Sequence, residues 1–350
     1  MKRQQLFICE KWNEILSNVM REEYGRGVST VICRVTVWLS VQVIAHSHLL
    51  PTKLLLHFTM FYGHMLFATP LDLHAVAGGK WAVITGATDG IGKAYAYEMA
   101  RKGFNIFAVS RTQSKLDEIE KDIREKYSKV EVKTFAFNFC VGSVDAYAPL
   151  LDALNEVEVG VLVNNVGMSY EYPEVLHNVE GGLKRIGDIT TINTLPNTIL
   201  CSSLIKQMLP RKKGIIVNIS SSAANNHMAL WAVYSATKKY VTWLSKILRM
   251  EYSDSGLIIQ TISPMMVATK MSKVRKTSFF TPNAEQFVAS AARSIGLTDE
   301  TTGFLSHQLQ GGSEHLWRDR VALANFFSNG DSMSSIEKLN FRCEILNSCQ

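Results

Sequence analysis

The sequence feature that most constrains the fold is an alternation of apolar runs and helical runs between residues 80 and 307. The helical runs include Ile91–Lys102, Ser114–Tyr127 and Trp231–Ser253. Strands that are apolar throughout and separated by helices predict a parallel sheet covered on both faces. We therefore expect an α/β fold with a doubly wound parallel sheet. The strands are expected at Trp81–Thr85, Asn105–Ser110, Val130–Phe137, Val159–Asn165, Gly214–Ser221 and Leu257–Pro264.

Composition narrows the class of protein further. With 47% hydrophobic residues and 22 Gly against 8 Pro, the chain is not disordered, collagen-like or a small disulfide scaffold. The net charge of +6 suits phosphate-bearing ligands or a membrane surface and is too small for a nucleic-acid binder, so we expect no nucleic-acid partner. The six cysteines are scattered without zinc-ligand spacing, which predicts neither a metal site nor a disulfide framework.

Residues 1–78 are expected to attach the chain to a membrane. Val28–Leu50 holds twenty-three residues with one formal charge, Arg34. A helix of that length would measure about 34 Å against a bilayer core of about 30 Å. Arg34 adds a cost of about 2.5–3.5 kcal/mol to membrane insertion, as a charge near the centre of a span does. A second apolar run, 54–68, is shorter. The apolar run begins too late for a signal peptide. One span with an interfacial helix, a tight hairpin and a buried helix all stay open.

A glycine-rich turn joins the first expected strand to the first expected helix. Glycines there let the chain turn sharply and bring backbone N–H groups against a pyrophosphate at the helix N-terminus. The pattern T-G-x-x-x-G-x-G differs from the commoner G-x-G-x-x-G, but it stands between a strand and a helix as a Rossmann-like site requires. The alternative is a glycine-rich turn without a ligand. The candidate dinucleotide-binding residues of the turn are Gly86, Thr88, Asp89, Gly90, Ile91 and Gly92.

The end of the second strand predicts the type of dinucleotide. A free ribose 2′-hydroxyl would be met by an acidic residue about twenty positions past the glycines. Here the strand ends in Ser110 and Arg111, with no carboxylate nearby. A guanidinium group suits a 2′-phosphate, so we expect NADP(H) rather than NAD(H). If Arg111 is only a solvated surface charge, the preference stays open.

Tyr234 and Lys238 are four residues apart and therefore neighbours on one helical face. An ammonium group near a phenol favours the phenolate, so we expect Lys238 to lower the pKa of Tyr234 from about 10. Such a phenol can protonate a carbonyl oxygen as a hydride arrives. A Y-x-x-x-K pattern is common by chance, but this one follows Ser221 by thirteen residues, at the strand edge where α/β folds bind ligands. Ser221 can donate to the same oxygen, or it can be an ordinary helix N-cap.

These residues together resemble the short-chain dehydrogenase/reductase family over about 80–310, which we expect to form one NADP-binding reductase domain, residues 79–310. The resemblance implies that Tyr234 is the general acid and base, Ser221 orients the carbonyl, Lys238 holds the nicotinamide ribose and Asn193 supports a proton-relay water. It also implies further cofactor contacts. These are Asn138, which replaces the family's acidic residue for the adenine amine, and Asn165, Gly167, Val267 and Thr269.

Two residues, Val166 and Met265, depart from the usual family pattern. At both positions the sequence resembles the membrane-bound branch of very-long-chain 3-oxoacyl-CoA reductases and type 3 and 12 17β-hydroxysteroid dehydrogenases. Ala232–Tyr240 and Met265–Phe280 resemble its nematode member. This resemblance implies NADPH-dependent reduction of a 3-oxoacyl-CoA in fatty-acid elongation, at the endoplasmic reticulum membrane with the catalytic domain in the cytosol.

The resemblance implies as partners a homodimer and other elongation enzymes. A keto-steroid substrate is the alternative, and a non-catalytic membrane-bound scaffold is the alternative from another class. Residues 311–350 depart from the branch, whose members continue with another helix and a lysine-rich end.

Overall fold

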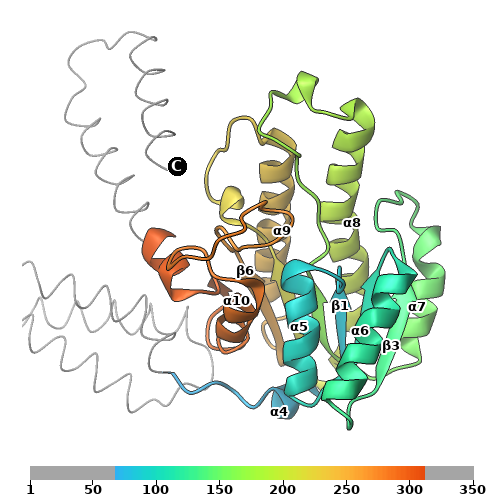
Figure 1. Ribbon diagram of the computed structural model, residues 1–350. Coiled ribbons are helices and arrows are strands. Elements are labelled where there is room, and N and C mark those ends of the chain that lie inside the picture. Colours follow the sequence, from blue (N-terminus) through green and yellow to red (C-terminus); the bar gives the residue numbers. More distant parts are fainter. Residues whose placement is uncertain (1–67, 312–350) are drawn as a thin grey trace, which may run out of the picture.

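The computed structural model describes residues 68–311 of the chain (Figure 1). Seven parallel strands form one sheet in the order β3-β2-β1-β4-β5-β6-β7. The chain therefore builds one half of the sheet outward from β1 and then returns to build the other half from β4. The strands are β1 (Trp81–Thr85), β2 (Asn105–Ser110), β3 (Val132–Ala136), β4 (Val159–Asn164), β5 (Gly214–Ile219), β6 (Leu257–Ile262) and β7 (Glu300–Thr301).

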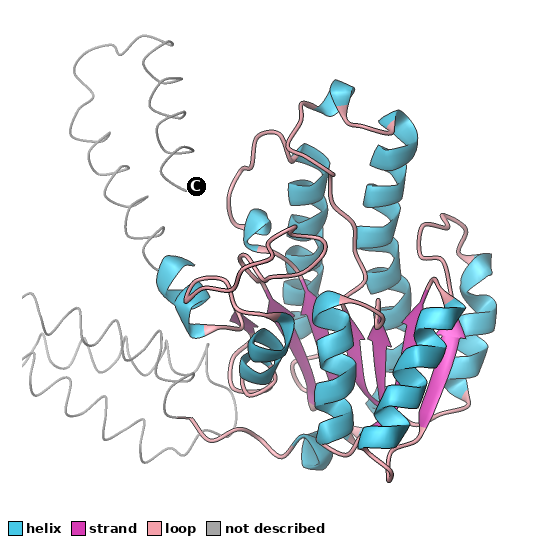
Figure 2. Ribbon diagram, in the orientation of Figure 1, coloured by secondary structure: helices cyan, strands magenta, loops and turns pink. Residues whose placement is uncertain are grey.

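Helices cover both faces of this sheet, so the doubly wound architecture is confirmed (Figure 2). One face packs against α4 (Leu73–Ala77), α5 (Gly90–Arg101), α6 (Gln113–Lys126) and α10 (Ala284–Ala291). The other face packs against α7 (Ala148–Asn155), α8 (Gly182–Met208) and α9 (Ala232–Glu251).

Burial on both faces explains why the strands are apolar throughout. Successive side chains of a strand point to opposite faces of the sheet. In β1, Ala82 and Ile84 belong to the core on the α5 face, whereas Trp81 and Val83 belong to the core on the α8 face. A polar residue in a strand is buried and needs a hydrogen-bond partner, as Gln260 of β6 has in two backbone carbonyl oxygens, so such residues are few.

Several element ends differ from the sequence-based expectation. β3 is shorter at both ends than 130–137, and β5 ends at Ile219, two residues before Ser221. Ser221 instead caps a short 3-10 helix, Ser222–Ala224, and its hydroxyl oxygen accepts a hydrogen bond from the backbone N–H of Ala223 at 3.1 Å. The polypeptide thus leaves the sheet just before the serine.

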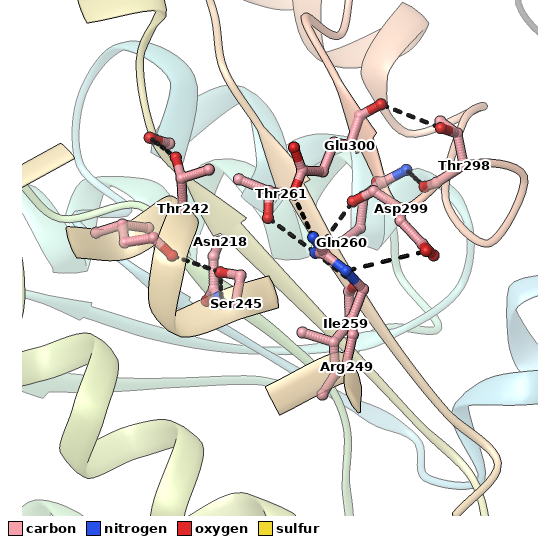
Figure 3. Close-up of polar contacts among 12 residues, drawn as sticks. Asn218, Thr242, Ser245, Arg249, Ile259, Gln260, Thr261, Thr298, Asp299 and Glu300 are labelled. Atoms are coloured by element: carbon pink, nitrogen blue, oxygen red, sulfur yellow. Dashed lines mark hydrogen bonds and ion pairs between the residues drawn. The ribbon is translucent and has the colours of Figure 1, made fainter. Parts of the chain in front are cut away.

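The two-residue edge strand β7 was not predicted, and a partly buried arginine holds it in place (Figure 3). Arg249 of α9 donates from Nη1 to Thr261 Oγ1 at 3.0 Å and forms an ion pair through Nη2 with Glu300. Beside it, Gln260 Nε2 donates to the carbonyl oxygens of Ser294 and Thr298, each at 2.8 Å. Side chains from α9 and β6 therefore anchor the segment that forms β7.

The expected membrane segments 28–50 and 54–68 lie outside the described residues except for Ala68, and so does nearly all of the tail 311–350. Among residues 68–311, no helix combines the length and the apolar character that a bilayer crossing needs. The predicted membrane attachment stays a prediction.

Candidate active site

The glycine turn lies at the carboxyl end of β1 and leads into α5. Gly86 has φ +66° and Gly90 has φ +51°, which are left-handed conformations that favour glycine. At Gly92 a Cβ would collide with the Gly86 carbonyl oxygen and with the Asn165 side chain. The first N–H groups of a helix have no partner within the helix and attract anions. The turn therefore fits a dinucleotide pyrophosphate, because its backbone can be approached closely.

The turn is fastened to the segment after β4. Asn165 donates from Nδ2 to the Thr85 carbonyl oxygen at 3.0 Å, and Thr85 Oγ1 accepts from the backbone N–H groups of Asn165 and Val166, each at 3.0 Å. The Asn165 side chain, which we predicted to contact the cofactor, thus supports the turn that would hold it. Thr85 also supports the turn, although we did not predict it as a site residue. The signal that could have found it is its place at the start of the T-G pattern.

The end of β2 comes beside the same turn. Thr88 Oγ1 and Ser110 Oγ share a hydrogen bond at 2.7 Å, which places Arg111 next to the glycine turn. Arg111 is exposed, and within residues 68–311 it has no ion pair. An unpaired guanidinium group at this position fits a 2′-phosphate, as expected for NADP(H).

Ser221, Tyr234 and Lys238 come together at the carboxyl end of β5. Ser221 lies close enough to Tyr234 for its hydroxyl to lower the pKa of the phenol. Lys238 Nζ lies 5.9 Å from the centre of the Tyr234 ring and donates to the Ile219 carbonyl oxygen at 3.0 Å. A Cβ at Gly167 would lie 3.4 Å from Lys238 Nζ, so the segment after β4 borders this cluster. The catalytic roles of the three side chains stay predictions.

The electrostatics of the cluster differ from the sequence-based expectation. Burial raises the pKa of Tyr234 above its usual value, and the nearby Ser221 hydroxyl only partly opposes this. Burial also lowers the pKa of Lys238 to about 8. The expected lowering of the Tyr234 pKa is therefore wrong for this arrangement, because desolvation of the buried phenol dominates.

Asn193 lies in α8 and is fully buried. Its Oδ1 accepts from the Met168 N–H at 2.8 Å, and its Nδ2 donates to the Met168 carbonyl oxygen at 2.9 Å and to Thr237 Oγ1 at 3.0 Å. The side chain thus clamps the segment after β4 to the helix that carries Tyr234. The backbone carbonyl oxygen of Asn193 also accepts a hydrogen bond, from Asn197 Nδ2 at 3.1 Å, and the predicted support of a relay water stays a prediction.

The other predicted cofactor residues have mixed surroundings. Asn138 is exposed, and its Oδ1 accepts from the Cys140 N–H at 3.2 Å, so it stabilises a turn after β3. The Thr269 side chain lies against Gly90, since a Cβ there would be 3.2 Å from Thr269 Cγ2. Val267 is buried, and its carbonyl oxygen accepts from Ser272 Oγ at 2.7 Å. Of these three, Thr269 is brought to the glycine turn.

Sequence reasoning missed an aromatic support beneath Tyr234. The Tyr170 hydroxyl accepts from the Val233 N–H at 3.1 Å, and its ring stacks on Trp231 with centroids 5.6 Å apart. Trp231 in turn meets the Tyr234 ring edge-on at 6.2 Å. Single aromatic residues in a loop give no periodic signal, which explains why they were missed.

Comparison with known proteins agrees with this geometry. Residues 80–278 match the family model described as short chain dehydrogenase, which is more than half of the chain. The chain belongs to the short-chain dehydrogenase family. The family resemblance predicted from the glycine turn and the Tyr–Lys pair is confirmed.

Relatives within the short-chain dehydrogenase family carry names of two kinds. The very-long-chain 3-oxoacyl-CoA reductase let-767 of Caenorhabditis elegans is 60% identical over 258 residues, covering 74% of this chain and 82% of the relative. Putative steroid dehydrogenase 1 of the same organism is 52% identical over 248 residues, covering 71% and 79%. Among solved structures, a short-chain dehydrogenase from Sphingobium yanoikuyae in complex with NADPH is 24% identical. It has a TM-score of 0.59 and covers 73% and 98%, and the likeness shows a shared fold.

Proposed function

We propose that this protein is an NADPH-dependent reductase that converts the 3-keto group of a long or very-long-chain 3-oxoacyl-CoA to the 3-hydroxyl group. The meeting of Ser221, Tyr234 and Lys238 at the carboxyl end of β5, beside the segment fastened to the glycine turn, carries the proposal. The 60% identity to a named very-long-chain 3-oxoacyl-CoA reductase supports the choice of substrate.

NADP(H) is the proposed cofactor because the residues fit it. The glycine turn would receive the pyrophosphate, and Arg111 with Ser110 would meet the 2′-phosphate. Lys238 would reach the ribose next to the nicotinamide. When bound, NADPH supplies the hydride that reduces the carbonyl carbon.

The residues of the chain control the proton that completes the reduction. The raised pKa of Tyr234 keeps its phenol protonated at neutral pH, which is the form that a proton donor needs. Ser221 donates a hydrogen bond to the substrate oxygen, and the Tyr234 hydroxyl gives that oxygen its proton. The phenolate left behind is stabilised by the Lys238 ammonium, and water restores the proton. Lys238 is mostly charged at pH 7, since its pKa is about 8.

A keto-steroid is the second candidate substrate, because the same three side chains would reduce either ketone. The 52% identity to a putative steroid dehydrogenase favours it, though less strongly than the reductase relative favours the acyl-CoA. Exposed Met266 and Met271 would suit an acyl chain or a sterol alike.

Purified protein tests the proposal directly. Wild type should oxidise NADPH with a long-chain 3-oxoacyl-CoA, and Tyr234→Phe should lower turnover by about 10³-fold or more while it still binds NADPH. The control is Tyr240→Phe on the same helix. Within residues 68–311 its hydroxyl bonds only to Thr198, at 2.6 Å, so the variant should leave turnover near wild type. Faster turnover of estrone than of the acyl-CoA would favour the steroid function. Equal inactivity of wild type and Tyr234→Phe would favour the scaffold.

The proposal also includes a cellular setting. The protein would act in fatty-acid elongation with other elongation enzymes at the endoplasmic reticulum membrane, attached through residues 28–68. A homodimer would pair through α9, where Trp243, Ile247 and Met250 are exposed on one face. Membrane fractionation of the full chain, and the solution mass of wild type against Trp243→Glu, test these two parts.

A further inference from the structure

The loop between β6 and α10, residues 263–283, is tied to the glycine turn. Lys270 Nζ lies 3.1 Å from Asp89 Oδ2, an ion pair with the residue that caps α5. Thr269, one residue earlier, lies against Gly90. The first half of the β6–α10 loop is thus held over the turn that would receive the cofactor pyrophosphate.

The same loop is tied a second time, to the segment after β4. Lys273 Nζ pairs with Glu171 Oε1 at 2.5 Å, donates to the Glu171 carbonyl oxygen at 3.0 Å and lies 3.6 Å from the centre of the Tyr172 ring. Tyr170, the residue before Glu171, stacks on Trp231, and Trp231 contacts Tyr234. The loop therefore runs from the glycine turn to the neighbourhood of the catalytic tyrosine.

Past the second tie, the loop offers two cations without partners. Arg275 and Lys276 are exposed, and across the described range 68–311 neither has an ion pair, in contrast to Lys270 and Lys273. Exposed apolar side chains, Met271 at 56% and Phe279 at 66%, flank them. The loop thus presents free positive charge beside apolar surface, two and three residues past the contact between Lys273 and Glu171.

We propose that Arg275 and Lys276 bind the phosphate groups of the coenzyme A part of the substrate. This inference rests on the proposed acyl-CoA function. An acyl-CoA carries its reacting ketone close to the thioester and its phosphates at the far end of a flexible arm, so it needs cations outside the catalytic cluster. Charge-assisted contacts of guanidinium and ammonium groups with phosphate supply that recognition. A keto-steroid has no group for these cations to bind.

The test compares one 3-oxoacyl group carried on coenzyme A and on pantetheine, which lacks the phosphates. In the Arg275→Gln/Lys276→Gln variant, the KM for the CoA thioester should rise about tenfold while kcat is kept, because two exposed charge contacts are lost. The KM for the pantetheine thioester and the KM for NADPH should stay at the wild-type values. Arg275→Lys should retain most of the affinity for the CoA thioester.

The control variant Lys129→Gln/Lys213→Gln removes two exposed charges that precede β3 and β5. Both therefore lie at the amino ends of the strands, whereas the candidate site lies at the carboxyl ends. This variant should leave every KM unchanged. Calorimetric titration of NADP-loaded protein with free coenzyme A and with pantetheine gives a readout without turnover. Coenzyme A should bind more tightly to wild type, and the difference should vanish in the Arg275/Lys276 variant.

The inference is overturned if the variant weakens both thioesters equally, raises the KM for NADPH instead, or leaves the binding of coenzyme A unchanged. Failure of the proposed function looks different: wild type would reduce neither thioester with NADPH. The titration would then still decide whether Arg275 and Lys276 bind the coenzyme A phosphates.

Discussion

The ammonium group of Lys238 donates a hydrogen bond to the carbonyl oxygen of Ile219, the last residue of β5, across 3.0 Å. This contact holds a buried cation at the carboxyl end of β5, one helical turn from Tyr234. The backbone carbonyl oxygen, rather than a carboxylate, is its partner, so burial is not balanced by an opposite charge. The lowered pKa of Lys238 follows from that imbalance.

We predict that this lysine makes stability depend on pH. Its pKa is about 8 in the folded chain and about 10.4 when unfolded, so the unfolded state binds more protons between these values. The free energy of unfolding should therefore rise with pH across this window, by about 1.6 kcal/mol from pH 8 to 9.5. Urea unfolding of cofactor-free wild type and Lys238→Met, compared at both pH values, measures the effect. An equal pH dependence of the two proteins would contradict it.

Arg111 should determine the choice between the two nicotinamide cofactors. Arg111→Gln removes the guanidinium group beside the glycine turn, so the KM for NADPH should rise about 10–100-fold while the KM for NADH changes little. Steady-state kinetics with both cofactors measures the ratio. Lys129→Gln, which removes an exposed charge far from the turn, should leave the ratio as in wild type. A similar rise for both cofactors would mean that Arg111 does not read the 2′-phosphate.

Gly92 should tolerate no side chain. In Gly92→Ala the new methyl group would collide with the Gly86 carbonyl oxygen and the Asn165 amide, so the turn must open. We expect a loss of about 2 kcal/mol or more in the free energy of unfolding and the loss of NADPH binding, measured by denaturation and by NADPH fluorescence. Gly187→Ala in α8 is the matched control. A Cβ there meets nothing within 4 Å, so it should be neutral or stabilising by up to about 1 kcal/mol.

Arg249 should stabilise the edge of the sheet without affecting chemistry. Arg249→Met removes the hydrogen bond to Thr261 and the ion pair with Glu300, and we expect a loss of about 2 kcal/mol in the free energy of unfolding. Thermal or urea denaturation measures it. Lys246→Met, an exposed position on the same helix, should stay within about 0.5 kcal/mol of wild type. Equal stability of the two variants would show that β7 is held by other contacts.

The sheet was largely predictable because its strands are buried on both faces. Trp81–Thr85 and Asn105–Ser110 were predicted with the bounds that the structure has. β7 could not be predicted, because two polar residues at an edge have no hydrophobic pattern and depend on Arg249 from a distant helix. The ends of β5 and β6 were misplaced for a related reason: a polar or proline residue can continue an extended chain after the ladder has stopped.

The candidate site was predictable as a set of positions and less so as a set of contacts. The glycine turn and the Tyr234–Lys238 spacing are local patterns, so the sequence alone is enough to recognise them. The contacts of Asn165 and Asn193 join segments far apart in the chain, so their use as clamps needed the structure. The pKa of Tyr234 depends on how deeply the fold buries it, which spacing cannot reveal.

The two asparagine clamps share one short stretch of backbone. Asn165 fastens it to the turn after β1, and Asn193 fastens Met168, three residues on, to Thr237 in the helix that carries Tyr234. The candidate nucleotide site and the candidate ketone site are therefore joined by the same stretch of backbone, residues 165–168. We expect that ordering of this stretch by either ligand lowers the entropic cost of binding the other, which would link the two affinities equally in both directions.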